Sequence, residues 1–173
     1  MAAVLSADMQ TTDKVVINVE ECREMGIAIS PPDVNRGDFR FVADTSKSIV
    51  YGLGAIKGLG EGPIEALVKA RADAPFKDLY DLCDRADSKK VNKRAIEALI
   101  GSGALDELVD DALVPEGLVA IDYKRSLLFA NQEDAVKLAE QKSRNQDSGL
   151  TDLFGDEMLV GDADGGRYHH FDN

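Results

Sequence analysis

Glycine recurs through one short stretch of the chain and limits what that stretch can form. The glycines that precede Pro63 there are Gly52, Gly54, Gly58, Gly60 and Gly62. Because glycine weakens helix and strand interiors and tolerates tight turns, the stretch favours turns over regular structure. Pro63 suits the first turn of a helix, where the N–H that proline lacks would have no partner. We therefore predict a tight turn at Gly58-Leu59-Gly60 that leads directly into a helix.

The predicted turn has the chemistry of a phosphate site. Leu59 can anchor the turn in the core, which leaves backbone N–H groups facing outward. Together with the unpaired amides and partial positive charge of the following helix N-terminus, these groups attract an anion. A DNA phosphate fits such a site without any base being read. Lys57, Lys69 and Arg71 can add attraction that weakens as the salt concentration rises.

These features match the helix-hairpin-helix pattern. The candidate DNA-binding residues of this turn are Lys57, Gly58, Leu59, Gly60 and Gly62. The alternative interpretation is an ordinary glycine-rich connection before a helix. A Walker phosphate loop is excluded, because no Gly-Lys-Ser or Gly-Lys-Thr sequence follows.

A second basic cluster, Lys89-Lys90-Val91-Asn92-Lys93-Arg94, follows about 33 residues later. Asn92 is a good N-cap for a further helix. Helix, turn and helix therefore repeat, although the second turn lacks the Gly-x-Gly pattern. We add Lys89, Lys90, Lys93 and Arg94 to the candidate DNA-binding residues. The alternative for this cluster is the solvated start of a helix.

The charge of the chain argues against nucleic acid until its distribution is considered. The 173 residues have a net charge of −12, whereas DNA-binding domains normally carry a basic surface. Residues 1–56 hold five basic and eight acidic groups, residues 57–94 hold nine and seven, and residues 95–173 hold six and seventeen. The only segment with a positive balance is the one that contains both candidate turns.

The remaining pattern predicts a mainly α protein: a helix-hairpin-helix DNA-binding domain with a small β-hairpin and a long C-terminal helix. The expected elements are a helical segment Met1–Ile29 that Gly26 can end, strands Phe39–Val42 and Ser48–Tyr51, a helix from Pro63, a short helix Asp78–Asp84, a helix after Asn92 that Gly101 and Gly103 end, and a long helix Glu116–Ser143 opened by Pro115.

Other classes of protein find little support. Cys22 and Cys83 lie far apart without zinc or disulfide spacing, so we expect both to be reduced and buried. No stretch approaches the length of an apolar membrane span, which favours a soluble intracellular protein. A small acidic enzyme is the weakest interpretation, because His169 and His170 lie in a polar tail without a positioned acid or nucleophile.

Several passages, taken in order, resemble one family. They are residues 1–9, 21–27, 31–35, 51–62, 89–94 and 99–106. This set resembles part of the fingers region of the alpha subunit of bacterial DNA polymerase III, the family C replicative polymerases. The resemblance covers about two-thirds of the chain strongly, and the remainder as far as Phe154 more loosely.

The resemblance implies a fragment of a polymerase. The catalytic aspartates of that family, which use Mg²⁺, belong to a portion that precedes the matched region, so we expect no catalytic residue, cofactor or metal in this chain. The helix-hairpin-helix element would hold double-stranded DNA through backbone contacts and support template-directed synthesis by the parent enzyme. The implied partners are duplex DNA, the sliding clamp and other replicase subunits, in the bacterial cytoplasm and without a membrane.

The resemblance also implies a clamp-binding peptide in the acidic tail. The family uses Gln, two further residues and then Leu-Phe or Met-Phe to bind the clamp. This chain has Leu150-Thr151-Asp152-Leu153-Phe154, with Leu150 in place of Gln. Leu150, Asp152, Leu153 and Phe154 are therefore the candidate clamp-binding residues. Docking of Leu153 and Phe154 back onto the domain is the alternative.

These predictions divide the chain into four parts. They are residues 1–56, the end of the fingers region; residues 57–108, a tandem helix-hairpin-helix-like DNA-binding region; residues 109–145, a helical extension; and residues 146–173, a flexible acidic tail with the clamp-binding candidate. A free-standing helix-hairpin-helix module that binds a protein partner remains the alternative function, favoured by the acidic last third.

Overall fold

The computed structural model of the protein describes residues 1–9 and 12–148. Its elements are α1 (Ala2–Asp8), α2 (Thr12–Glu24), β1 (Ala28–Ser30), β2 (Val42–Thr45), β3 (Ser48–Val50), the 3₁₀ turn η1 (Leu53–Ala55), α3 (Glu61–Ala70), α4 (Leu79–Arg85), α5 (Lys93–Ser102), the 3₁₀ turns η2 (Asp106–Leu108) and η3 (Asp111–Leu113), and α6 (Ala120–Asp147). The predicted fold class, mainly helical with a small sheet and a long C-terminal helix, is confirmed.

The N-terminal segment is not the single helical stretch that we predicted. It forms α1 and α2, and α2 ends at Glu24, just before Gly26, whose φ of 74° is in the left-handed region that glycine favours. The Gly26 amide donates to the carbonyl of Arg23 at 3.1 Å, and the Ile27 amide donates to the carbonyl of Cys22 at 2.8 Å. This pair of bonds satisfies the last carbonyls of the helix and turns the chain into β1.

The predicted β-hairpin is present with its second strand in place, but its first strand is displaced and a third strand joins it. The sheet order is β1-β3-β2, with β3 antiparallel to β2 and parallel to β1. Residues 39–41 do not belong to β2, because Asp38 and Phe39 instead accept hydrogen bonds from the amides of Leu53 and Gly54 at 2.8 and 2.9 Å. The third strand was missed because parallel pairing joins segments that no local turn connects.

Two hydrophobic clusters hold the described residues together. In the smaller one, α1, α2, β3 and the segment just before β2 contribute Leu5, Val15, Cys22, Phe41 and Ile49. In the larger one, the helices from α3 to α6 contribute Leu67, Leu79, Leu82, Ile96, Leu99, Leu127 and Leu128, among others, and all seven are fully buried. Phe39 and Tyr51 pack against both clusters, so the small sheet is joined to the helical part through aromatic side chains.

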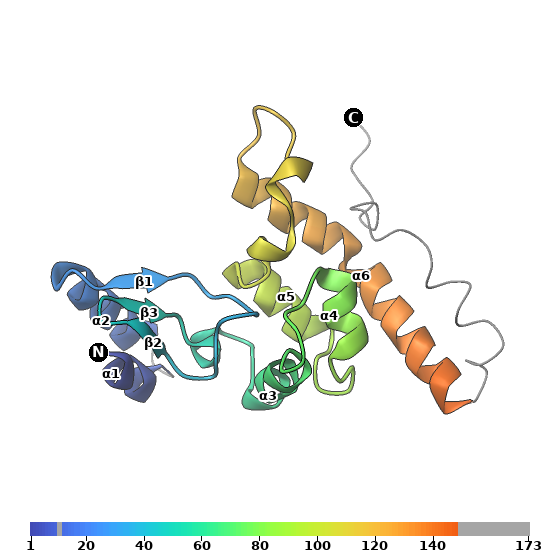
Figure 1. Cartoon of the computed structure of the whole chain (residues 1–173), viewed down its shortest axis with the longest axis horizontal. Helices are drawn as coiled ribbons and strands as arrows, with labels where there is room; N and C mark the ends of the chain where they lie inside the picture. Colours follow the sequence, from blue (N-terminus) through green and yellow to red (C-terminus); the bar gives the residue numbers. More distant parts are fainter. Residues whose placement is uncertain (10–11, 149–173) are drawn as a thin grey trace.

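The long helix α6 crosses the helical part from one end to the other (Figure 1). It begins at Ala120 rather than at the predicted Glu116, because Gly117 has a φ of 88° and the chain turns between Pro115 and Leu118. The helices predicted near Asp78 and after Asn92 are confirmed. Within the described ranges, no helix combines the length and apolar character that crossing a membrane requires.

Both cysteines are free and buried, as predicted. Cys22 lies in the smaller cluster and Cys83 in the larger one. Burial raises the pKa of the Cys83 thiol to about 12, and the neighbouring carboxylates of Asp78 and Asp84 act in the same direction. The thiolate is the reactive form of cysteine, and the raised pKa keeps the Cys83 thiol protonated near neutral pH. Cys83 therefore serves as a small apolar side chain in the core.

Candidate nucleic-acid interface

The glycine turn is anchored by two apolar side chains. Ile56 and Leu59 are 8% and 6% exposed, and the Leu59 amide donates to the Ile56 carbonyl at 3.2 Å. Between them Gly58 has a φ of 88°, a conformation that strains any residue with a Cβ. The backbone on either side of Leu59 is exposed at Gly58 and Gly60. The predicted combination of a buried leucine and outward-facing glycines is therefore present.

The N-terminus of α3 follows this turn and has no side-chain cap. Gly60 is the N-cap residue and Pro63 is the third residue of the helix, so this end offers the amides of Gly60, Glu61 and Gly62 as donors. None of these three amides has a recorded acceptor within residues 1–9 and 12–148. A helix end with three outward donors and a positive dipole is a preformed site for a phosphate oxygen.

The approach to these amides is open. A Cβ built on Gly60 would meet only the Cδ of Pro63, at 3.8 Å, and one built on Gly62 would meet nothing within 4 Å. Lys57, on the N-terminal side of the turn, is exposed. Glu61 and Glu65 are also exposed, and their negative charges oppose an anion nearby. The site is therefore suited to contact through backbone amides more than through side-chain charge.

The second turn, between α4 and α5, is organised differently. The Asp87 carbonyl accepts from the amides of Lys90 and Val91 at 3.0 and 2.8 Å, and its carboxylate accepts from the Lys89 amide at 3.0 Å. The N-terminus of α5 is capped by Asn92, as predicted, with the Ala95 amide donating to Oδ1 at 3.0 Å. The second turn thus lacks the open helix end of the first one and contributes mainly side-chain charge.

The four basic residues near the second turn do not have equal surroundings. Lys89, Lys90, Lys93 and Arg94 are all exposed. Lys93 forms an ion pair with Glu133 of α6, with 2.6 Å between Nζ and Oε1. This hydrogen bond raises the pKa of Lys93 and lowers the pKa of Glu133. Lys89, Lys90 and Arg94 form no ion pair with any described residue, so their charges are available to a phosphate backbone.

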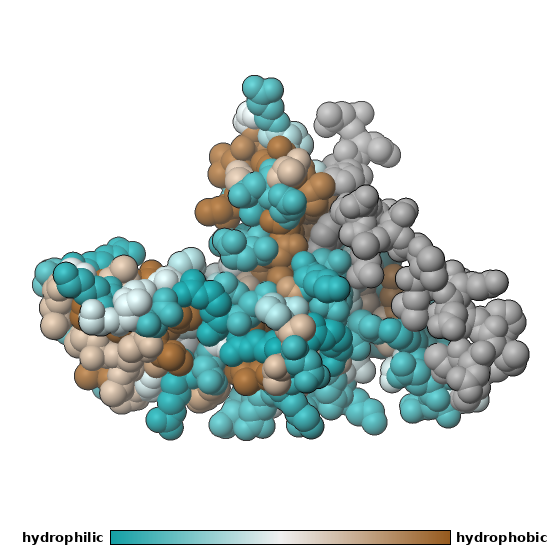
Figure 2. Space-filling model, viewed as in Figure 1, coloured by the Kyte–Doolittle hydropathy of each residue, from teal (hydrophilic) through white to brown (hydrophobic). Residues whose placement is uncertain are grey.

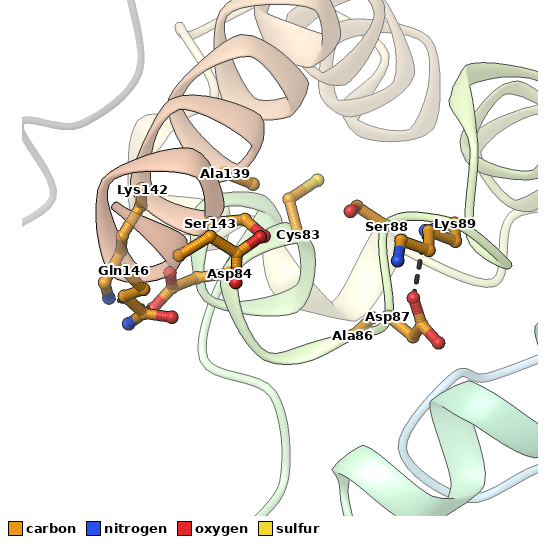
Figure 3. Close-up of a pocket in the computed structure, with 11 residues that line it drawn as sticks. Cys83, Asp84, Ala86, Asp87, Ser88, Lys89, Ala139, Lys142, Ser143 and Gln146 are labelled. Atoms are coloured by element: carbon orange, nitrogen blue, oxygen red, sulfur yellow. Dashed lines mark hydrogen bonds and ion pairs between the residues drawn. The ribbon is translucent and has the colours of Figure 1, made fainter. Parts of the chain in front are cut away.

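A hollow of about 390 Å³ lies between the second turn and the end of α6 (Figure 3). Its lining includes Lys89 and Lys142 together with three carboxylates, from Asp84, Asp87 and Asp147. Lys142 is already paired with Asp84, with 2.6 Å between Nζ and Oδ2. This mixed charge makes the hollow a poor phosphate site, although it lies beside a basic turn.

Arg71, which we expected to add attraction at the phosphate site, uses one of its donors within the protein. Its Nη1 donates to the Val34 carbonyl at 2.7 Å, and burial lowers the pKa of its guanidinium. Lys69, in contrast, is exposed. The sequence places Arg71 at the end of α3 but does not show that the Val34 carbonyl approaches it from another segment.

Two further polar residues hold the first hairpin in place, and the sequence analysis missed both. The guanidinium of Arg85 donates at 2.7 Å to the carbonyls of Ala70 and Ala74, at the end of α3, and lies 5.0 Å from the centroid of the Phe76 ring. Asn35 exchanges two hydrogen bonds with the Phe76 backbone, at 3.0 and 2.8 Å. Asn35 and Phe76 are 41 residues apart, and no spacing in the sequence signals that contact.

The helix-hairpin-helix motif family matches residues 26–112, which include both turns and the helices α3, α4 and α5. The chain belongs to the helix-hairpin-helix family.

Relatives with similar sequences carry one name. The chain is 52% identical to the DNA polymerase III subunit alpha of Pseudomonas aeruginosa over 168 residues, which cover 95% of this chain and 14% of that protein. The same subunit of Vibrio cholerae is 49% identical, and that of Escherichia coli K12 is 46% identical, each over 90% of this chain and 12% of the relative. The predicted resemblance to a segment of this subunit is confirmed, and the chain spans about one-seventh of the length of the curated relatives it matches.

Proposed function

We propose that this chain holds duplex DNA by sequence-independent backbone contacts, as the helix-hairpin-helix segment of a bacterial replicative polymerase alpha subunit. The observation that carries the proposal is the uncapped N-terminus of α3 behind the anchored glycine turn. Contact through backbone amides reads no base, which suits an enzyme that moves over every sequence. Nucleotide transfer, its catalytic aspartates and its Mg²⁺ belong, in this proposal, to other segments of the parent enzyme, alongside other replicase subunits.

The free charges near the two turns set the expected strength of binding. Lys57, Lys89, Lys90 and Arg94 are exposed and form no ion pair with a described residue. Four phosphate contacts give a slope of about −3.6 in a plot of log affinity against log salt concentration. Binding is therefore weak near physiological salt and strengthens steeply at low salt.

The first experiment distinguishes DNA binding at the amide site from non-specific binding elsewhere on the protein. Gly60→Val places a branched side chain before the three amides, and the Gly60 backbone (φ −82°, ψ 172°) accepts it without strain. The matched control Ala72→Val enlarges an exposed side chain beyond the other end of α3. Titration of a fluorescent duplex should show affinity about tenfold lower for Gly60→Val, as expected for the loss of one charge-assisted hydrogen bond, and no change for the control. Equal affinity for both variants would refute the amide site.

The second experiment tests the charges. Lys90→Gln combined with Arg94→Gln should reduce the magnitude of the salt slope by about 1.8. The control pair, Lys14→Gln with Lys47→Gln, removes the same charge from exposed positions at α2 and the β2–β3 turn and should leave the slope unchanged. If the two pairs of substitutions change the slope equally, binding depends on the total charge of the protein and not on the charges at the second turn.

Clamp tethering forms a separate part of the proposal. Leu150, Asp152, Leu153 and Phe154 lie outside the described residues, so sequence alone supports this part. Leu153 and Phe154 would fill an apolar pocket on a bacterial sliding clamp, without the hydrogen bonds that Gln makes at the position of Leu150. Calorimetry with a purified clamp should give a binding heat that Leu153→Ala with Phe154→Ala abolishes. The absence of heat with the unaltered chain would end this part of the proposal.

A further inference from the structure

An exposed apolar strip lies on the part of the chain that we call the arm, residues 106–122. The arm contains η2, η3 and the start of α6, and it projects from the molecule on the side away from α3 (Figure 1). Leu118, Val119 and Ile121 within it are 56%, 64% and 51% exposed. Figure 2 shows hydrophobic residues gathered on the arm, with hydrophilic residues among them and at its tip. Three large apolar side chains in four successive residues are thus presented to solvent.

The arm is held firmly although its strip is uncovered. Arg125 of α6 donates to both carboxylate oxygens of Asp106, with Nε–Oδ1 and Nη2–Oδ2 distances of 3.1 and 2.9 Å. Lys124, only 7% exposed, pairs with Asp111 at 2.7 Å, and Val109 is 1% exposed. The strip therefore occupies a fixed position before any partner arrives, which lowers the entropic cost of binding.

The charge around the strip has one sign. Residues 101–123 contain no lysine or arginine and six carboxylates, from Asp106, Glu107, Asp110, Asp111, Glu116 and Asp122. Asp106 and Asp111 are paired as above. The other four form no ion pair with any described residue, and Glu116 and Asp122 flank the strip directly in sequence. This surface repels DNA and attracts basic groups.

We propose that the strip Leu118–Ile121 is a docking site for a protein segment that presents apolar side chains rimmed by lysine or arginine. Charge selects this occupant over the alternatives. A second copy paired about a two-fold axis would bring the acidic surroundings of both strips, including Glu116 and Asp122, into one interface. Residues 149–173 of the chain contain six carboxylates and one arginine, so they carry the same sign of charge as the arm. The site lies away from the DNA-binding turns and does not depend on DNA binding.

The experiment uses the full chain and two synthetic peptides as probes. Both are 18-residue amphipathic helices with the same leucine face, and their polar faces carry lysine in one and glutamate in the other. The lysine peptide should bind saturably and shift backbone NMR signals of residues 116–124, whereas the glutamate peptide should not bind. Leu118→Ser with Ile121→Ser should weaken binding of the lysine peptide at least tenfold. The matched control, Val16→Ser with Ile17→Ser, alters side chains of α2 that are 53% and 55% exposed and should bind as the unaltered chain does.

Three results would overturn the proposal. The first is equal binding of the lysine peptide by the strip variant and the control. The second is a pattern of NMR shifts spread over the acidic surface without preference for the arm. The third is sedimentation showing a dimer that Leu118→Ser with Ile121→Ser dissociates, which would assign the strip to a second copy. All substituted side chains are exposed, so circular dichroism should show the same fold in every variant.

Discussion

The glycine turn offers a stability test in which substitution by alanine should be costly at Gly58 and nearly neutral at Gly60. Gly58 has a φ of 88°, and a Cβ built on it lies 4.0 Å from the Cβ of Ala98, an ordinary contact. The cost of Gly58→Ala is therefore the left-handed backbone alone, about 1–2 kcal/mol of unfolding free energy. Gly60 has φ −82° and ψ 172°, which alanine adopts freely, and its Cβ would meet only the Pro63 Cδ at 3.8 Å. Alanine restricts the unfolded chain, which stabilises, but it is a poorer N-cap residue than glycine, which destabilises by a similar amount, so Gly60→Ala should change the unfolding free energy by less than about 0.5 kcal/mol.

Urea unfolding followed by circular dichroism measures both effects. A difference of about 1.5 kcal/mol between the variants, divided by a slope of about 2 kcal/mol per molar urea, separates their midpoints by about 0.7 M. The slope itself should be equal in both, because neither substitution changes the surface that unfolding exposes. Coincident midpoints, or a midpoint for Gly60→Ala below that of Gly58→Ala, would refute the reasoning that the left-handed backbone of Gly58 determines the difference.

Two further predictions concern titratable groups. Because both cysteines are buried and the pKa of Cys83 is raised to about 12, a thiol reagent at pH 8 should label neither cysteine in the folded protein and both in urea; rapid labelling of the folded chain would contradict the packing described here. The folded pKa of Glu133 is lowered by Lys93, so the stability from this pair is present above the unfolded pKa of Glu133 and is lost as the pH falls through its folded pKa. Unfolding of Lys93→Met between pH 3 and 6 should show less pH dependence than the unaltered chain, and an unchanged pH profile would show that the pair contributes nothing.

Local signals in the sequence predicted the backbone geometry of the two turns. The turn around Leu59 and the cap at Asn92 depend on the conformations and hydrogen bonds of a few neighbouring residues. Gly103 follows α5 in the way that Gly26 follows α2. The amides of Gly103 and Ala104 donate to the carbonyls of Ile100 and Leu99 at 3.1 and 3.0 Å. Predictions failed where two distant segments meet, as in the parallel pairing of β1 with β3.

The sequence by itself determined the order of the helices, the place of both turns and the segment with a positive charge balance, because these follow from residues close together in the chain. Only the tertiary structure decided which charges remain free. It pairs Lys93 with Glu133 and commits Arg71 to the Val34 carbonyl, while Lys90 and Arg94 stay unpaired among the described residues. It also buries Leu127 and Leu128 but leaves Leu118, Val119 and Ile121 on the surface of the arm. Both outcomes depend on which segments fold against each other, and that cannot be read from local spacing.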